Sequence, residues 1–359
     1  MPSILSINAG SSSIRFAFYG LSNALEKQLY GKLDRIGERD ATLTFKCADG
    51  VGGSVVVPEG CVASHFLLDW LEGQKLFKQL RSVGHRIVHG LRHKEPELIT
   101  ETLLHELRTL IDHDPEHLPR EIELIEVLKK RHPQLSQTAC FDTAFHQFMP
   151  RVATMLPLPR RYEAQGVRRY GYHGLSFAYL MQELVRLGDP SARNGRVILA
   201  HLGNGASLAA VRDGAGIDTS MGFTPASGLV MSTRSGDLDP GLANFFFRTE
   251  GMTPAQFQHM TNHSSGLLGV SETSSDMRDL LAKESTDERA AEAVALFCYQ
   301  VKKAVGSYSA ILGGIDTLVF SGGIGENCAS IRSRICMGLD FLGIKLNEES
   351  NALHEAIIS

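Results

Sequence analysis

One local pattern occurs twice in this sequence, and it limits the folds that the chain can adopt. In each copy an apolar, strand-like run leads into a turn of glycine and small polar residues, and a second apolar run follows. The first turn is Asn8–Ser13 and the second is His201–Ser207. Small residues let a ligand approach the backbone, whose N–H groups can face an anion. One such turn alone favours an ordinary hairpin, but the repeat predicts two similar half-domains, each opening with a hairpin that can hold phosphate.

Length and composition exclude several classes of protein. The 359 residues suffice for two domains with substantial cores, and 43% hydrophobic and 21% charged residues are typical of a globular protein. A formal charge of −4 without a basic run argues against a nucleic-acid partner, and no apolar stretch is long enough to span a membrane. The six cysteines show neither CxxC pairs nor zinc spacing, so we expect reduced thiols and a cytoplasmic protein.

Periodicity predicts a mixed α/β chain with a domain boundary after residue 150, in an apolar, proline-rich stretch. The expected domains are therefore 1–150 and 151–359. The helical spacings cover 65–80, 101–111, 120–130 and 289–312, and the stretch 170–176 starts a further helix that runs to about residue 187. The later strands cover 83–90, 138–141 and 317–320. A glycine-rich loop over 321–327 is expected to open a helix that runs through residue 335. This loop is neither a Walker A loop nor a dinucleotide fingerprint.

Three polar residues stand out at the ends of predicted elements. Arg86 lies between apolar neighbours in a strand, so it needs a carboxylate, a phosphate or water, and a structural ion pair is an equal alternative. Asp142 follows a strand, where open α/β sheets place their chemistry, or it caps the next helix. His173 sits at a Gly-flanked helix start and is a candidate to face an anion, although a lone histidine is more often structural.

Two long polar segments of the second half also suggest function. The stretch 218–239, with Ser232–Asp237 at its core, is too apolar and too poor in charge for a linker, and long irregular segments of compact proteins are usually functional. The stretch 274–279 predicts a helix start at Asp276. A strand followed by the glycine loop Gly322–Asn327 and a helix is an anion-binding arrangement.

Taken together, these stretches resemble the acetate kinases of the sugar kinase, Hsp70 and actin superfamily. The matching motifs follow the family's order along the chain and are Asn8–Ser13, Gly84–Gly90, Phe141–Gln147, Arg168–Gly174, His201–Gly205, Asp218–Pro240, Ser274–Asp279 and Gly322–Asn327. The resemblance implies two ribonuclease H-like α/β domains, the actin-like ATPase fold, with the active site in the cleft between them. It also implies a homodimer that transfers the γ-phosphoryl group of ATP to acetate, with Mg²⁺, or Mn²⁺ in its place, as the cofactor.

The family's roles pass to matching positions of this sequence. ATP or ADP would be bound by Arg15, His201, Leu202, Gly203, Asn204, Gly205, Asp276, Met277, Arg278, Gly323, Ile324, Gly325, Glu326 and Asn327. Asn8 would lie on the magnesium side. Arg86 and Arg234 would bind the acid and the transferring phosphoryl group, and Asp142 and His173 would be catalytic. The small acyl pocket would be lined by Val88, Tyr172 and Pro225, without any nucleic-acid or membrane partner.

Elementary chemistry agrees with these roles. A carboxylate is already ionised at neutral pH, so its attack on a phosphoryl group needs alignment and charge neutralisation rather than a general base. The forked guanidinium of arginine suits both carboxylate and phosphate oxygens. We therefore expect Asp142 to position an arginine or hydrated magnesium, while an intermediate phosphorylated on a carboxylate stays open.

The sequence departs from the family pattern in places that bear on the acyl group. Arg15 replaces a lysine, Tyr172 replaces a phenylalanine, and 110–115 is more acidic than in relatives. Acetate is the expected acid and propionate the alternative, with a butyrate kinase as a weaker rival. Relatives continue beyond the position of Ser359 with a strand, a glutamate-bearing turn associated with magnesium and a closing helix. Their lack leaves a catalytically weak or non-catalytic nucleotide-binding homologue as a further alternative.

Overall fold

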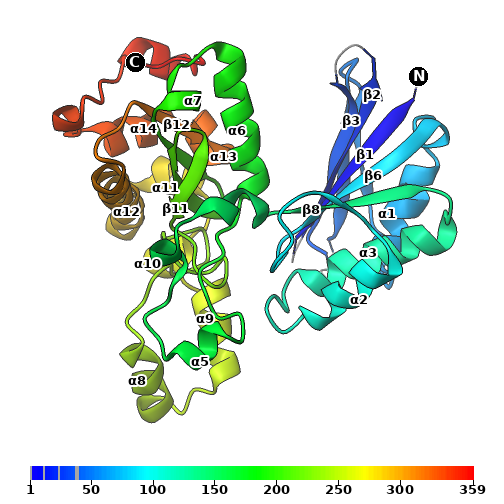
Figure 1. Ribbon diagram of the computed structural model, residues 1–359, viewed down its shortest axis with the longest axis horizontal. Coiled ribbons are helices and arrows are strands. Elements are labelled where there is room, and N and C mark those ends of the chain that lie inside the picture. The colour runs from blue at the N-terminus through cyan, green and yellow to red at the C-terminus, as the bar shows by residue number, and fades with distance from the viewer. Residues whose placement is uncertain (1, 11–12, 23–24, 37–39) are drawn as a thin grey trace. The chain divides into compact units, whose positions relative to one another are not determined.

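The computed structural model describes residues 2–10, 13–22, 25–36 and 40–359 (Figure 1). The chain divides into two compact units, Met1–Ala144 and Phe145–Ser359, so the division falls a few residues before the predicted boundary at residue 150. All six cysteines lie in the described part and are free thiols. Within the described ranges, every helix is too short or too polar to cross a bilayer.

The first unit is built on a mixed sheet. Its strands are β1 (Ser3–Ala9), β2 (Ser13–Leu21), β3 (Leu25–Asp34), β4 (Thr42–Cys47), β5 (Gly52–Val56), β6 (Leu80–Ile87), β7 (Glu97–Leu98) and β8 (Ser136–Phe141), in the order β5-β4-β3-β2-β1-β6-β8-β7. The first five strands form antiparallel neighbours, and β1, β6 and β8 run parallel. The predicted N-terminal hairpin is therefore confirmed as β1–β2.

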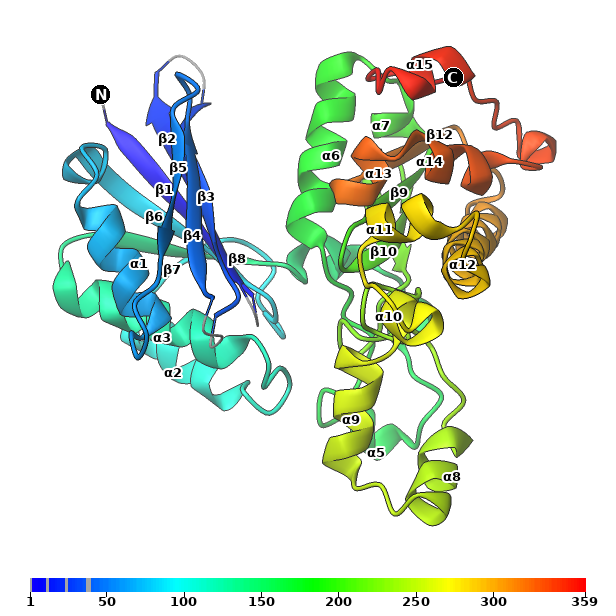
Figure 2. The same ribbon diagram turned by 180° about the vertical axis from the view of Figure 1, so that it is seen from behind.

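Helices cover one face of this sheet. They are α1 (Ala63–Glu72), α2 (Glu101–Thr109) and α3 (Leu118–Arg131), with a short 3-10 helix at Phe77–Gln79. Figure 2 shows α1 and α3 on the same face of the sheet. Leucines of these helices pack with Leu5 and Ile7 of β1, which alternate inward as a half-buried strand requires. The helix predicted over 65–80 is too long, because Gly73 ends α1 and Leu80 already belongs to β6.

The second unit repeats the centre of the first sheet. Its strands are β9 (Arg196–Leu202), β10 (Ala206–Arg212), β11 (Ala215–Thr219) and β12 (Thr317–Ser321), in the order β11-β10-β9-β12. A hairpin, β9–β10, is flanked by a third antiparallel strand on one side and a parallel strand on the other. The strands β3-β2-β1-β6 have the same order and directions, which confirms the repeat predicted from the two glycine turns.

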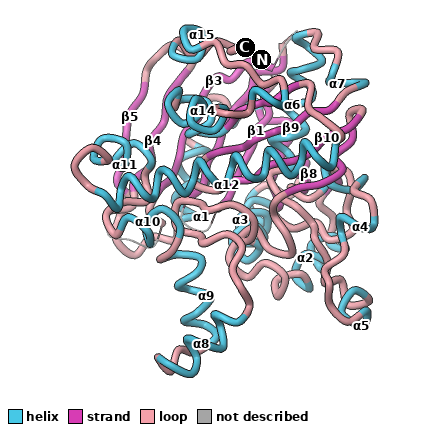
Figure 3. The backbone as a smooth tube through the Cα atoms, turned by 90° about the vertical axis from the view of Figure 1, so that its left-hand side faces the viewer, coloured by secondary structure: helices cyan, strands magenta, loops and turns pink. Residues whose placement is uncertain are grey.

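Two long helices, α6 and α12, lie on opposite sides of the second sheet (Figures 1 and 3). The helices of this unit are α4 (Arg151–Thr154), α5 (Arg160–Glu163), α6 (Gly174–Leu187), α7 (Ser191–Asn194), α8 (Gly241–Thr249), α9 (Pro254–His263), α10 (Gly266–Ser271), α11 (Met277–Lys283), α12 (Glu288–Leu312), α13 (Gly322–Asn327), α14 (Ala329–Cys336) and α15 (Glu348–Ala352); short 3-10 helices cover Ala144–Phe148, at the unit boundary, and Asp340–Leu342. Phe177 and Met181 of α6 pack on Val197 and Leu199 of β9, while the apolar side of α12 covers the other face. The predicted glycine loop over 321–327 is wrong, because Gly322–Asn327 is itself helical and Cys328 separates it from α14.

Candidate active site

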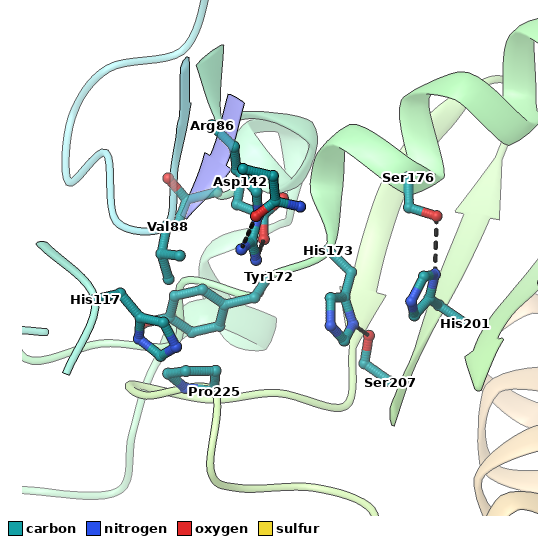
Figure 4. A network of polar contacts seen from close by, with 12 residues as sticks. Arg86, Val88, His117, Asp142, Tyr172, His173, Ser176, His201, Ser207 and Pro225 are labelled. Atoms are coloured by element: carbon teal, nitrogen blue, oxygen red, sulfur yellow. Dashed lines mark hydrogen bonds and ion pairs between the residues drawn. The ribbon is translucent and has the colours of Figure 1, made fainter. Parts of the chain in front are cut away.

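Three polar side chains meet at one edge of the first sheet. Asn8, Arg86 and Asp142 lie at the carboxyl ends of the parallel neighbours β1, β6 and β8, where α/β sheets bind their ligands. Arg86 Nη1 donates to Asn8 Oδ1 at 3.1 Å. Its Nη2 donates to Asp142 Oδ2 at 2.6 Å (Figure 4). Asp142 is only 2% exposed, and its backbone N–H donates to Ile87 O at 2.9 Å. Its carboxylate is thus engaged by an arginine, which favours the positioning role over a helix cap.

A second buried acid supports this edge and was not predicted from the sequence. Both carboxylate oxygens of Glu121 accept from the backbone N–H of Val88 at 3.2 Å. Burial raises the pKa of Glu121 well above its ordinary value, although the charge of Arg86 acts in the opposite direction. Glu121 is spaced with Leu118 and Ile125 on the apolar side of α3, and a charged residue on that side was the available signal.

The charge balance keeps Arg86 cationic. Burial by itself lowers the pKa of Arg86, whereas the carboxylates of Asp142, Glu121 and Asp114 raise it. The carboxylates together have the larger effect, so the pKa of Arg86 lies above its ordinary value. The guanidinium therefore stays charged while part of it remains accessible, since the side chain is 21% exposed. Such a group can bind an anion.

The β1–β2 register places Arg15 beside this edge. Asn8 pairs directly with Arg15, and Arg15 pairs with Lys32 of β3, so the three side chains share one face of the sheet. Arg15 is exposed. Its predicted contact with nucleotide phosphates is compatible with this position and stays a prediction.

In the second unit, two histidines lie together at the start of α6 and the end of β9. His173 adopts a left-handed backbone conformation, with φ of 59°, and its Nδ1 lies 2.8 Å from Ser207 Oγ (Figure 4). His201 Nδ1 lies 2.9 Å from Ser176 Oγ, and the two rings are 4.4 Å apart. A left-handed histidine is uncommon and occurs most often where the surroundings require it. Ser207 was part of the predicted turn but its contact with His173 was not foreseen.

The turn after β9 brings His173 and Arg234 to one place. A Cβ atom added to Gly205 would lie 3.2 Å from His173 Nε2 and 3.6 Å from Arg234 Nη1. Because Gly205 has no side chain, the side chains of His173 and Arg234 can both approach the backbone of the turn. Arg234 Nη1 also donates to the carbonyl of Pro225 at 3.1 Å, and Tyr172 Oη donates to the carbonyl of Phe223 at 2.6 Å. The predicted residues Tyr172, Pro225 and Arg234 thus belong to one connected region.

The two glycine segments of the second unit are also neighbours. Because β12 runs parallel to β9, with Ser321 beside His201, Gly322–Asn327 begins next to the turn His201–Gly205. A Cβ atom on Gly203 would lie 3.8 Å from the backbone nitrogen of Gly323. The glycines of both segments bring backbone atoms close together at the carboxyl edge of the sheet, which suits a phosphate-bearing ligand.

The third predicted nucleotide segment is less closely tied to this edge. Asp276 caps α11, and both its carboxylate oxygens accept from the guanidinium of Arg278, at 3.0 and 2.5 Å. The Arg278 side chain is 89% exposed. Across the described residues, no hydrogen bond joins Asp276 or Arg278 to the glycine turns, so their part in nucleotide binding stays a prediction.

Sequence comparison identifies relatives over nearly the whole chain. The model of the acetokinase family matches residues 3–359. An acetate kinase of Rhodopseudomonas palustris (strain TIE-1) is 42% identical over 359 residues, which cover 97% of this chain and 89% of the relative. A propionate kinase of Citrobacter rodentium (strain ICC168) is 40% identical over 363 residues, covering 99% and 90%.

Solved structures agree with this assignment and confirm the predicted fold. A propionate kinase from Francisella tularensis subsp. tularensis SCHU S4 matches with a TM-score of 0.93 and 35% identity, covering 100% of this chain and 93% of that structure. The acetate kinase of Porphyromonas gingivalis matches with a TM-score of 0.87 and 34% identity, covering 98% and 90%. The two repeated sheets are the ribonuclease H-like domains of the actin-like ATPase fold. A family match over almost every residue, with relatives of this identity, shows that the chain belongs to the acetokinase family.

Proposed function

We propose that this protein is an acetate kinase, which reversibly transfers the γ-phosphoryl group of ATP to acetate and forms acetyl phosphate and ADP. The observation that carries the proposal is the charged Arg86, held between Asn8 and Asp142 at the carboxyl edge of the first sheet. A fixed guanidinium fits the carboxylate of an acid and the oxygens of a phosphoryl group. Membership of the acetokinase family supports the same chemistry.

The proposal divides the work between residues of the two units. The nucleotide is held by the glycine segments His201–Gly205 and Gly323–Asn327, assisted by Asp276–Arg278. The acid is held by Arg86, and Val88, Tyr172 and Pro225 limit its size. A carboxylate oxygen of the acid attacks the γ-phosphorus, the bond to the bridging oxygen breaks, and ADP leaves. Arg234 and His173 stabilise the phosphoryl group in the transition state of its transfer. In such reactions most of the catalytic effect comes from this electrostatic stabilisation.

Asp142 has no proton to remove in this reaction, because the attacking acid is already ionised. Its carboxylate accepts from Arg86 at 2.6 Å, so its role is to hold the guanidinium in place. Direct in-line transfer needs no covalent intermediate on the protein. Positioning of charged groups before the reaction supplies the rate enhancement.

Magnesium is the expected cofactor, and the residues present fit it in a limited way. The described residues contain no cluster of three or more His, Cys, Asp or Glu side chains arranged for a metal. Mg²⁺ commonly keeps several waters and uses one or two protein oxygens together with substrate phosphates. The amide oxygen of Asn8 and the carboxylate of Asp142 would supply those oxygens, and the ion would neutralise phosphate charge; Mn²⁺ suits the same donors.

The test is a hydroxamate assay of the purified protein with ATP, magnesium and a series of acids from formate to butyrate. Acetyl hydroxamate formation with acetate as the preferred acid supports the proposal. Preference for propionate or butyrate would assign a different acid kinase, and nucleotide binding without acyl phosphate formation would assign a non-catalytic homologue. We also propose that the protein is cytoplasmic and forms a homodimer. Sedimentation of the full chain would test the dimer.

A further inference from the structure

The segment before α6 is joined to the loop after β11 by a series of hydrogen bonds. Arg169 Nη1 donates to the carbonyls of Thr219, Ser220 and Met221 at 3.2, 3.3 and 3.2 Å. The backbone N–H of Tyr170 donates to Gly222 O at 3.0 Å. The last contact in the series is the side chain of Tyr172, whose hydroxyl donates to Phe223 O at 2.6 Å.

The residues after Phe223 carry this constraint to Arg234. Ser227 Oγ accepts from the backbone N–H of Gly222 at 2.7 Å, which closes 222–227 into a compact turn. Pro225 lies in this turn, and its carbonyl accepts from Arg234 Nη1 at 3.1 Å. The turn is therefore held near its start by the tyrosine hydroxyl and in its middle by the guanidinium.

We propose that the hydroxyl of Tyr172 is a positioning and specificity group, which fixes the turn 222–227 and thereby sets both the place of Pro225 in the acid subsite and the orientation of Arg234. This inference rests on the proposed function for the identity of the substrate, a short-chain carboxylic acid. The hydroxyl is directed to Phe223 O, so it acts on the wall of the subsite rather than as a polar group offered to the acid.

The physical argument concerns the freedom of the turn. A phenylalanine at position 172 would keep the ring but remove the donor at Phe223 O, and a hydrogen bond of this kind contributes about 0.5–1.5 kcal/mol, or about 2- to 12-fold in an equilibrium. The turn would then move more easily away from the ring. A looser wall admits longer acids. In a tight apolar pocket, one extra methylene of the substrate changes the specificity by about 10- to 200-fold.

Tyr172→Phe is the test variant and Tyr170→Phe is its matched control. The hydroxyl of Tyr170 also donates to a backbone carbonyl at 2.6 Å, but to Gly166, away from the turn. Both substitutions thus delete a tyrosine–carbonyl hydrogen bond within three positions of the same segment, and Tyr170→Phe also removes the contact of its hydroxyl with Arg168. Thermal unfolding of both variants is measured first, so that a difference in folding is recognised as such.

The kinetic experiment compares kcat/KM for acetate, propionate and butyrate. In Tyr172→Phe we expect the propionate-to-acetate ratio to rise by about 2- to 10-fold and kcat for acetate to fall, with KM for ATP unchanged. Tyr170→Phe should keep the ratio of the unmodified protein. Equal ratios in all three proteins would overturn the specificity role.

Amide hydrogen exchange over 221–227 provides a readout that does not depend on activity. Exchange there should accelerate in Tyr172→Phe and stay unchanged in Tyr170→Phe. Unchanged exchange in Tyr172→Phe would overturn the anchoring role even if turnover fell. If the unmodified protein phosphorylated no acid, the proposed function would fail, while the exchange measurement would still decide whether Tyr172 anchors the turn.

Discussion

The guanidinium of Arg86 donates to the carboxylate of Asp142 at 2.6 Å, and that carboxylate is almost completely buried. A buried acid that is bound to an arginine in this way is poorly placed to exchange protons with a substrate. Its effect on chemistry passes through the arginine, whose position and charge it maintains. This relationship decides how the two residues should respond to substitution.

Replacing Arg86 by alanine should lower turnover by about 10²- to 10³-fold, the usual effect of deleting one preorganised charged donor. Asp142→Asn should lower turnover in the same direction, because the amide cannot balance the guanidinium charge. The hydroxamate assay measures both, and circular dichroism checks the fold. Arg92→Ala is the control, since Arg92 is 74% exposed and pairs with Glu106 at the surface. Turnover close to normal in Arg86→Ala would contradict the assignment.

Ser207 should matter through His173. Its hydroxyl lies 2.8 Å from His173 Nδ1 and holds the ring so that Nε2 faces Gly205. In Ser207→Ala we expect kcat to fall by about 2- to 10-fold with little change in KM for ATP, as one hydrogen bond is lost. Ser307→Ala, which removes a hydroxyl that donates to the carbonyl of Lys303 on α12, is the control. If steady-state kinetics show the same kcat in both variants, the contact has no part in catalysis.

Arg15 tests whether the first hairpin acts on phosphate. It lies directly opposite Asn8 in the β1–β2 register, on the face that also carries Lys32. Arg15→Lys should keep measurable activity because a cation remains, whereas Arg15→Ala should lose most of it and show a raised KM for ATP. Lys32→Ala serves as the control on the next strand. If the unmodified protein, Arg15→Lys and Arg15→Ala were equally active, Arg15 would be only a solvated surface residue.

Local patterns were sufficient to predict the longest helices, the central strands and the strand-end residues. The glycine turns at Asn8–Ser13 and His201–Ser207 predicted the repeated hairpins because strand periodicity and turn chemistry are local properties; residues 11 and 12 of the first turn lie outside the described residues. Glycines 322, 323 and 325 suggested a loop, yet this stretch is helical. The glycine at its start is required by tertiary packing instead, since a Cβ atom on Gly322 would lie 2.6 Å from Leu202 O.

Contacts between distant residues were beyond sequence reasoning. The bond from Tyr172 to Phe223 joins residues 51 positions apart, and nothing in the spacing of either residue indicates it. Glu121 is similar, because its partner is a backbone N–H, that of Val88, which no side-chain pattern reveals. Such contacts follow from the fold as a whole, which sets the positions that local patterns only nominate.

Glu121 should make the first unit less stable as pH rises. Its pKa is raised by burial in the folded state, so above the ordinary pKa of a glutamate the unfolded chain releases a proton that the folded chain retains. Stability is therefore lost with increasing pH until the folded-state pKa is passed. Glu121→Gln cannot ionise and should flatten this dependence, measured by urea unfolding at a series of pH values. Parallel pH profiles of the two proteins would contradict the prediction.

His85 should make the first unit less stable as pH falls, which is the opposite pH dependence to that of Glu121. It is 3% exposed on β6, its Nε2 lies 2.7 Å from Gln137 Oε1, and burial lowers its pKa from 6.5 to about 4. Between these values the unfolded chain binds a proton that the folded chain does not, so stability falls as pH drops through this window, by up to about 3 kcal/mol in total. The fluorescence of Trp70, the single tryptophan, reports on the first unit because its ring packs on Phe16 and Phe45. In urea unfolding followed by this signal, His85→Gln should remove most of the loss between pH 6.5 and 4, whereas the exposed control His105→Asn should retain it. An equal loss in both variants would show that His85 is not the group responsible.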